Sequence, residues 1–88
     1  MVYSIEFSNE FERSMKKLKK KNKVMFEQIQ KKLIDVVKNP EHYKPLGNIL
    51  FGLRRIHFGS FVLLYSIDEK NKTVVLEDYD HHDKIYGK

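Results

Sequence analysis

The spacing of apolar residues changes midway along the chain, and this change constrains the fold more than any other feature. Up to about residue 40, apolar side chains recur every three or four positions, as on one face of an α-helix. From residue 53 onward they alternate, as in strands with one covered face. The sequence therefore predicts two helices followed by three strands. The helical stripes are Phe11, Met15 and Leu18, then Phe26, Ile29, Leu33, Val36 and Val37; the alternating segments are 53–58, 61–67 and 73–79.

Residue types at the boundaries support this order. Residues 2–7 alternate and predict a first strand, and Ser8 suits the N-cap of a helix that runs to about residue 20. Asn22 suits the N-cap of the next helix, which Asn39-Pro40 ends. Because the turn between them is so short, the two helices must lie antiparallel. The predicted class is α+β with the order β-α-α-β-β-β, as one domain over residues 1–88 with both helices on one face of a small, mostly antiparallel sheet.

The dipeptide Gly59-Ser60 fixes which side chains share a face of the sheet. Two turn residues with glycine first predict a type II′ hairpin, which places Phe58 opposite Phe61. One face is then apolar, and we expect the helices to cover it. The alternation, continued through the turn at 69–72, assigns the remaining residues to an open face. That predicted face consists of Arg55, His57, Val62, Leu64, Ser66, Val75, Glu77 and Tyr79.

Composition narrows the class of protein. The 88 residues carry a formal net charge of +5, which favours a polyanion or an acidic protein as partner. The absence of cysteine excludes disulfides and thiolate metal sites. The chain has neither a signal-peptide pattern nor an apolar run of roughly 18 residues, so we expect a cytoplasmic protein with no membrane partner.

The segment DYDHHDKIY, residues 78–86, places two adjacent histidines among three aspartates. Neighbours on an extended segment point to opposite sides, so His81 and His82 are poorly placed to hold one ion. A zinc site that adds His42 would lack any known ligand spacing. We therefore expect no metal and no other cofactor. A solvated C-terminal segment is the simplest interpretation, but Ile85 and Tyr86 would then have little reason to follow it.

Lysines crowd the end of the first helix, in the segment KKLKKKNK at 16–23, and recur at Lys31 and Lys32. They form either a solvated helix end or a surface that contacts the phosphates of a nucleic acid without sequence choice. The sequence leaves both interpretations open. The lysines expected to bind substrate under the second are Lys16, Lys17, Lys20 and Lys21.

Residues 44–86, taken together, resemble the RelE/ParE toxin superfamily. The strings that carry the resemblance are K-P-L, then G-L-R-R-I-H-F-G-S-F-V-L-L-Y-S-I-D, then D-H-H-D-K-I-Y. The resemblance implies the β-α-α-β-β-β fold derived above. It also implies a toxin that cleaves messenger RNA on the ribosome or, in the ParE branch, inhibits gyrase, and that a cognate antitoxin neutralises.

The resemblance implies roles for single residues. Arg55 and His57 stand at the two basic strand positions near the scissile phosphate. His82 stands at the terminal basic position, which YafQ-like members fill with histidine, and Tyr86 at the terminal aromatic position. We expect these four residues to be catalytic, because RNA cleavage by its own 2′-hydroxyl needs a base, an acid and positive charge but no metal. The sequence does not decide which histidine is acid and which is base.

Two further basic residues are expected to bind substrate beside them. Lys44 sits near a position where some members place a histidine or glutamate, and Arg54 adjoins the catalytic strand residues. The chain departs from the family at Val62, where many RelE-like members carry arginine. Gly59-Ser60 also lacks the acidic residue that YafQ-like members place after the glycine.

The expected function is therefore an endoribonuclease toxin of a type II toxin–antitoxin pair. The alternatives are a ParE-like gyrase inhibitor without RNase activity and a basic nucleic-acid-binding module. For either toxin, the expected partner is an acidic, RelB-like antitoxin that is disordered alone and folds around the domain. We expect its carboxylates to find the lysine-rich helices and its apolar anchors to contact the open face at Val62, Leu64 and Val75.

Overall fold

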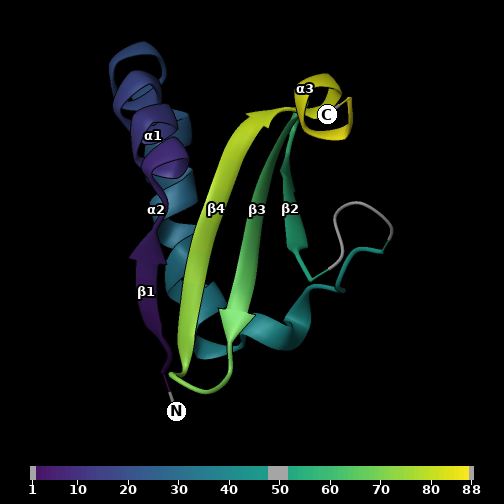
Figure 1. Ribbon diagram of the computed structural model, residues 1–88. Coiled ribbons are helices and arrows are strands. Elements are labelled where there is room, and N and C mark those ends of the chain that lie inside the picture. Colours follow the sequence, from purple (N-terminus) through teal and green to yellow (C-terminus); the bar gives the residue numbers. More distant parts are fainter. Residues whose placement is uncertain (1, 48–51, 88) are drawn as a thin grey trace.

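The computed structural model describes residues 2–47 and 52–87. It confirms the α+β class and the β-α-α-β-β-β order, and it adds a 3-10 helix, η1, and a short C-terminal helix, α3 (Figure 1). Residues 48–51, which lie between the second predicted helix and the strand predicted at 53–58, are outside the described residues. No helix in the described ranges is long and apolar enough to cross a membrane. The elements are β1 Ser4–Phe7, α1 Asn9–Lys21, α2 Lys23–Lys38, η1 Pro40–His42, β2 Arg54–Phe58, β3 Phe61–Asp68, β4 Thr73–His81 and α3 His82–Tyr86.

The two long helices begin at the predicted caps. The Ser8 hydroxyl accepts the backbone N–H of Phe11 at 3.0 Å, and the Asn22 side chain accepts that of Met25 at 3.1 Å. Each such bond satisfies an N–H that the first helical turn leaves unpaired and contributes about 1 kcal/mol. With only Asn22 between them, α1 and α2 run side by side in opposite directions, as Figure 1 shows.

The sheet has the strand order β1-β4-β3-β2, with β1 parallel to β4 and the other pairs antiparallel. The predicted hairpin register is confirmed, since Phe58 pairs with Phe61 and His57 with Val62. Gly59 has φ +61°, and Lys72 is the only non-glycine residue with positive φ in the described part of the chain. Ser60 therefore has negative φ, as a type II′ turn requires.

The helices bury one face of the sheet. At its centre Tyr65 is fully buried, and its hydroxyl donates to the carbonyl of Pro40 at 2.5 Å, which ties η1 to β3. Burial raises the pKa of Tyr65 to about 12, so this donor keeps its proton over the physiological pH range. The buried residues of this helix-side core are Phe11, Ile29, Val36, Ile56, Leu63, Tyr65, Val74, Leu76 and Tyr79.

The alternation predicted for the last strand is wrong at Tyr79. The register of β3 and β4 shifts between Leu64 and Tyr65, so that Glu77 is an extra residue on β4. Such a β-bulge inverts the alternation beyond it. Tyr79 consequently pairs with Leu63 and lies in the helix-side core. The residues that face the opposite side instead are Asp78, which pairs with Leu64, and Asp80, which pairs with Val62.

The opposite face is not open along its whole length, because α3 lies across part of it. Ile85 is 1% exposed and packs with Val62 and Leu64, which are 0% and 4% exposed. The expectation that Val62 and Leu64 are exposed and anchor an antitoxin is therefore wrong, because the chain's own C-terminal helix covers both side chains. An arginine in place of Val62 would bring a charge beneath Ile85, at a desolvation cost that only a partner such as Asp80 in the same cross-strand row could offset.

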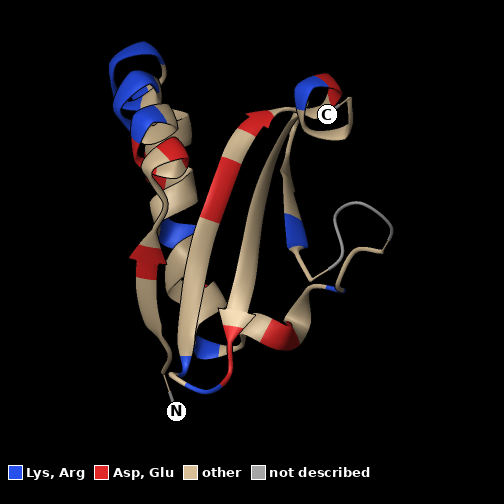
Figure 2. Ribbon diagram, viewed as in Figure 1, with Lys and Arg blue, Asp and Glu red and all other residues tan. Residues whose placement is uncertain are grey.

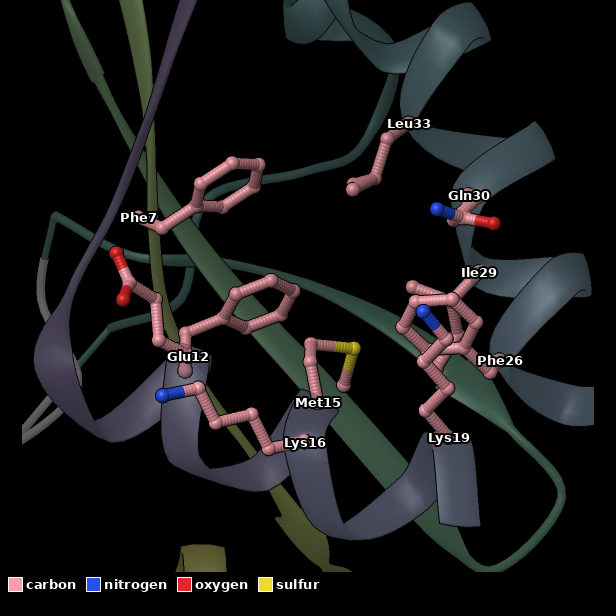
Figure 3. Close-up of a pocket in the computed structure, with 10 residues that line it drawn as sticks. Phe7, Glu12, Met15, Lys16, Lys19, Phe26, Ile29, Gln30 and Leu33 are labelled. Atoms are coloured by element: carbon pink, nitrogen blue, oxygen red, sulfur yellow. The ribbon is translucent and has the colours of Figure 1, made fainter. Parts of the chain in front are cut away.

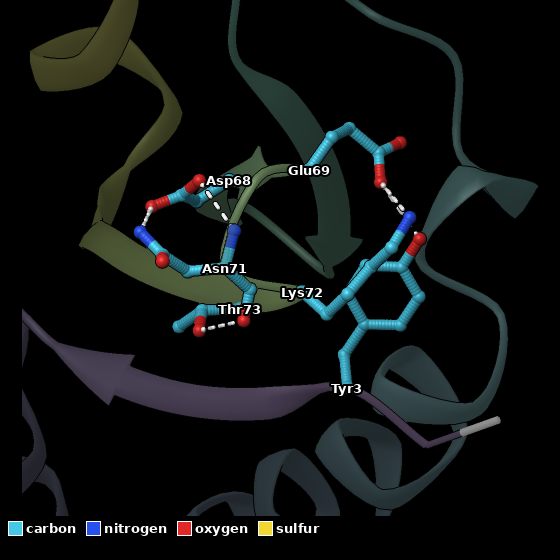
Figure 4. Close-up of polar contacts among 6 residues, drawn as sticks. All are labelled: Tyr3, Asp68, Glu69, Asn71, Lys72 and Thr73. Carbon is cyan, nitrogen blue, oxygen red and sulfur yellow. Dashed lines mark hydrogen bonds and ion pairs between the residues drawn. The ribbon is translucent and has the colours of Figure 1, made fainter.

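Side-chain hydrogen bonds close the turn between β3 and β4 (Figure 4). The Asp68 carboxylate accepts the backbone N–H of Asn71 at 3.1 Å and its side-chain amide at 2.8 Å. Glu69 accepts the hydroxyl of Tyr3 at 2.8 Å and the ammonium of Lys72 at 3.4 Å. The bonds from Asn71 lower the pKa of Asp68, and the bond from Tyr3 is the largest cause that lowers the pKa of Glu69. The turn is thereby tied to the start of the chain.

Candidate active site

The four residues expected to be catalytic meet at one end of the sheet, where α3 follows β4 (Figure 1). The Arg55 guanidinium donates to the Tyr86 hydroxyl at 2.6 Å and lies 5.8 Å from the centre of its ring. The rings of His57 and His82 are 6.4 Å apart, centroid to centroid, with 24° between their planes. The rings of His82 and Tyr86 are 4.6 Å apart. We call these four side chains the α3–β2 cluster.

Contacts outside α3 hold this helix in place. A helix of five residues is too short to be stable alone, so its position depends on packing and caps. The backbone N–H of His82 donates to the carbonyl of Ser60 at 2.8 Å, which joins α3 to the hairpin turn. His81 accepts the backbone N–H of Asp83 through Nδ1 at 3.2 Å and so caps the helix. Burial of Ile85 completes the attachment.

The two adjacent histidines diverge, as the sequence predicts. The ring of His81 contacts Phe61 edge to face, 5.5 Å between centroids, whereas that of His82 lies between His57 and Tyr86. In the ranges that the structure describes, no three His, Asp or Glu side chains are grouped so that they could hold a metal ion. The cluster itself can bind a phosphate through Arg55 and exchange protons through imidazoles.

Charge on the sheet face that α3 covers is divided between β2 and β4, the two strands that flank β3. The cross-strand rows run from His57 through Val62 to Asp80, and from Arg55 through Leu64 to Asp78. Glu77 extends the acidic side, where it accepts the hydroxyl of Ser66 at 2.8 Å. Figure 2 shows the acidic stretch on β4 and the basic residues on β2. A polyanion is therefore attracted to the β2 side and repelled from the β4 side.

Lys44 and Arg54 take different places. Lys44 lines a groove of about 630 Å³ together with Arg55 and His57, so it adjoins the cluster. Arg54 pairs with Tyr65 and thus points to the helix side. Its guanidinium donates to the carbonyl of Tyr43 and, at 3.3 Å, to that of Glu41. It therefore supports the segment that carries Lys44.

The structure does not bring the α1 lysines to the cluster. α1 packs against β4, and its lysines gather at its C-terminal end, away from the opposite edge strand β2 (Figure 2). Lys16 lines an apolar pocket between α1 and α2 instead. The members of this group are Lys16, Lys17, Lys20 and Lys21.

Sequence reasoning counted Lys32 among the possible phosphate contacts without placing it beside the cluster, and it missed Tyr43. Lys32 on α2 and Tyr43 after η1 line the same groove as Lys44. The path of the chain after α2 decides this proximity, and no local pattern specifies that path. The acidic side of the face was missed because the bulge at Glu77 has no glycine or other turn residue to signal it.

Comparison with known proteins identifies the family. Residues 5–86 match the family described as the ParE toxin of type II toxin–antitoxin systems. A Methanocaldococcus jannaschii protein named RelE4 is 42% identical over 88 residues, which covers 99% of this chain and 94% of that protein. The chain belongs to this ParE/RelE toxin family, and the resemblance found in the sequence is confirmed.

Solved structures agree with the family. A chain of the RelBE2 toxin–antitoxin complex from Mycobacterium tuberculosis has a TM-score of 0.79 and 28% identity, covering 92% of this chain and 99% of that one. A chain of the Escherichia coli DinJ–YafQ complex has a TM-score of 0.69 and 26% identity, covering 97% and 99%.

Proposed function

We propose that this toxin is an endoribonuclease that cleaves messenger RNA in association with the ribosome and so inhibits translation in the cytoplasm. The observation that carries the proposal is the α3–β2 cluster, in which a guanidinium, two imidazoles and a phenol converge. These groups supply positive charge and proton exchange at one place. Similarity to RelE4 and to a chain of the DinJ–YafQ complex supports the same function.

The cluster accounts for a metal-independent cleavage. A base takes the proton of a 2′-hydroxyl, whose oxygen attacks the adjacent phosphorus, and an acid gives a proton to the departing 5′-oxygen. The products are a 2′,3′-cyclic phosphate and a 5′-hydroxyl. His82 acts as general acid or base, and His57 is its partner or a phosphate ligand. Arg55 stabilises the phosphorane, and Tyr86 contacts a splayed base while its hydroxyl orients the guanidinium.

Mapping of cleaved messages tests this function. After controlled expression of the toxin, primer extension should find new 5′ ends within translated messages. Toxin treated with EDTA should cleave at the same rate as untreated toxin in a reaction with purified ribosomes that contains enough Mg²⁺ to keep the ribosomes intact. Zinc-dependent recovery of cleavage, or growth arrest with intact messages, would contradict the proposal.

The match to the ParE toxin family favours one alternative, a gyrase inhibitor without RNase activity. In that case the cluster would be a protein-binding surface. Supercoiling by purified gyrase in the presence of the toxin separates the two functions. Inhibited supercoiling together with intact messages would establish the alternative.

We further propose an acidic, RelB-like antitoxin as the partner, since chains of toxin–antitoxin complexes share this fold. In place of the covered Val62–Leu64 face, the pocket between α1 and α2 offers its apolar anchor site (Figure 3). This pocket has a volume of about 300 Å³ and includes Phe7, which is 46% exposed. Lys16 and Lys19 line it together with Glu12, so its net charge is positive and suits an acidic amphipathic segment. Its apolar lining consists of Phe7, Phe11, Met15, Phe26, Ile29 and Leu33.

A further inference from the structure

The groove beside the α3–β2 cluster has features that the cleavage step does not use. It lies next to β2, the edge strand of the sheet, and Lys32, Tyr43 and Lys44 line it together with Arg55 and His57. Its volume of about 630 Å³ falls within the ~300–1,000 Å³ of pockets that hold small ligands. Because Arg55 and His57 belong to both groove and cluster, a ligand in the groove lies next to a phosphate held by the cluster.

The groove also lies on the side to which charge directs an RNA strand. Within residues 2–47 and 52–87, the ion pairs involve only Lys72, His81 and His82 as cations, so neither Lys32 nor Lys44 forms a direct ion pair with a carboxylate of these residues. Across the sheet from the cluster, β4 presents Glu77, Asp78 and Asp80. A strand whose phosphate is bound at the cluster is therefore repelled from β4 and attracted past β2 into the groove.

Tyr43 is held in position in the groove before any ligand binds. Its ring packs edge to face on Tyr65, 6.5 Å between centroids, and on His42 at 4.9 Å. Its carbonyl accepts a hydrogen bond from Arg54. An aromatic ring that is already fixed loses little conformational entropy when a base packs on it. Splayed bases of single-stranded RNA commonly stack on such rings.

We propose that this groove binds the RNA nucleotide next to the cleaved phosphodiester and thereby influences which sequences are cut. The inference rests on the proposed endoribonuclease function. Lys32 and Lys44 contact the phosphate of that nucleotide, which gives affinity without base choice. Tyr43 packs against its base, which gives the choice.

The first test measures base choice in a ribosomal cleavage reaction. A set of messages differs only in the base on either side of one mapped cleavage site, and primer extension gives the initial rate for each. The wild type should prefer some bases at one of the two positions. Tyr43→Leu keeps apolar bulk against Tyr65 but removes the aromatic face, so it should lose that preference, with kcat/KM for the best base falling by about 5- to 150-fold. Tyr43→Phe keeps the ring and should keep the preference.

The second test measures the phosphate contact. The Lys32→Gln/Lys44→Gln double variant should cleave all messages of the set more slowly by one common factor. The slope of log kcat/KM against log salt concentration should flatten by about 0.7 for each lost contact with single-stranded RNA. Lys38→Gln/Lys70→Gln removes the same charge from exposed sites that do not line the groove, and it should change neither rate nor slope appreciably.

The outcomes separate the inference from the function on which it rests. A wild type that cleaves no message overturns both. A wild type that cleaves, with a Tyr43→Leu variant that folds and retains its base preference, overturns the base contact while the nuclease function stands. A lysine variant with the same salt slope as its control overturns the phosphate contact. Thermal unfolding of each variant shows whether it is folded when assayed.

Discussion

The two faces of the sheet differ in how much apolar surface holds their covering helices. Among residues 2–47 and 52–87, nine buried residues form the helix-side core, whereas three, Val62, Leu64 and Ile85, form the core beneath α3. The larger core stabilises the fold, and the smaller one holds only a five-residue helix. Because local stability follows the number of buried apolar contacts, α3 should open more easily than α1 or α2. Two of the four groups proposed to act on RNA, His82 and Tyr86, thus lie on the helix that is held by the smaller core.

The two faces also differ in the chemistry that they offer. The α3–β2 cluster presents charged and hydrogen-bonding groups from Arg55, His57, His82 and Tyr86. The pocket between α1 and α2 is mainly apolar with lysines along it (Figure 3). The first suits a nucleic acid, and the second suits an acidic protein with an apolar anchor. The two proposed sites would thus place an antitoxin on one face and RNA on the other.

The sharpest way to break this division is to remove the imidazole of His82. His82→Ala should reduce RNA cleavage by roughly 10²–10⁴-fold if this residue is the general acid or base. The unfolding midpoint in urea should change little, because the side chain is 51% exposed. Lys84→Ala removes another exposed side chain of α3 that belongs neither to the cluster nor to the groove, and it should keep most of the activity. Full activity of His82→Ala would place the chemistry on other residues.

The difference between the two cores predicts different outcomes for the same truncation. Ile29→Ala in the helix-side core should lower the free energy of unfolding by about 2–5 kcal/mol. Ile85→Ala should instead detach α3 and lower RNA cleavage at a temperature where the rest of the domain stays folded. Hydrogen exchange checks this, since amides of 82–87 should lose protection while those of β3 keep it. Equal loss of protection in both elements would mean that α3 is not an independent unit.

Much of the fold could be predicted because local signals agreed with one another. The helical stripes, the caps at Ser8 and Asn22 and the glycine-first turn all specify the same elements, and the hairpin register follows from the turn length. The convergence of Arg55 and His57 on one face follows from strand alternation alone. The family resemblance led us to expect His82 and Tyr86 of α3 near Arg55 and His57.

The features that the sequence did not predict depend on a register shift and on tertiary contacts, neither of which produces a local sequence pattern. The bulge at Glu77 inverted the face of Tyr79, and one register shift suffices to do this because the side-chain period of a strand is two. The cover of Val62 by Ile85 depends on a helix that a five-residue pattern is too short to reveal. The approach of Lys32 to Tyr43 is a tertiary contact across the path that follows α2.

A change in the helix-side pocket should affect the antitoxin without affecting RNA. Phe26→Ala removes an aromatic wall of this pocket, and loss of an anchor contact of about 2 kcal/mol would weaken antitoxin binding by roughly 30-fold. Ile34→Ala removes an exposed apolar side chain of the same helix that is not among the pocket-lining residues and should bind normally. Calorimetry with the co-expressed acidic partner measures both. Unchanged affinity for Phe26→Ala would place the antitoxin elsewhere.

A further test asks whether the lysines of α1 contact RNA or the antitoxin. If Lys16, Lys17, Lys20 and Lys21 contact RNA phosphates, as the clustering of charge in the sequence allows, changing all four to Gln should weaken binding of the ribosome or RNA. The salt dependence of log K should then flatten by about 0.7–0.9 per lost contact. An unchanged slope for RNA, with slower association of the acidic antitoxin, would assign these lysines to the antitoxin face instead.

The turn that joins β3 to β4 lies at the far end of the sheet from the cluster and should show the smallest effect. Asn71 lowers the pKa of Asp68 by hydrogen bonding to its carboxylate, so the ionised form is favoured in the folded state (Figure 4). This contribution to stability is present above the ordinary pKa of Asp68 and is lost as pH falls through its lower folded value. Because Asp68 is solvated, Asp68→Ala should lower the urea midpoint only slightly at pH 7, and the difference from the wild type should shrink as the pH falls below the ordinary pKa of Asp68. RNA cleavage at pH 7 should be unchanged, since neither α3 nor the groove contacts this turn. A loss of cleavage in Asp68→Ala would show that the two ends of β3 are coupled, and that the faces are less separate than their cores indicate.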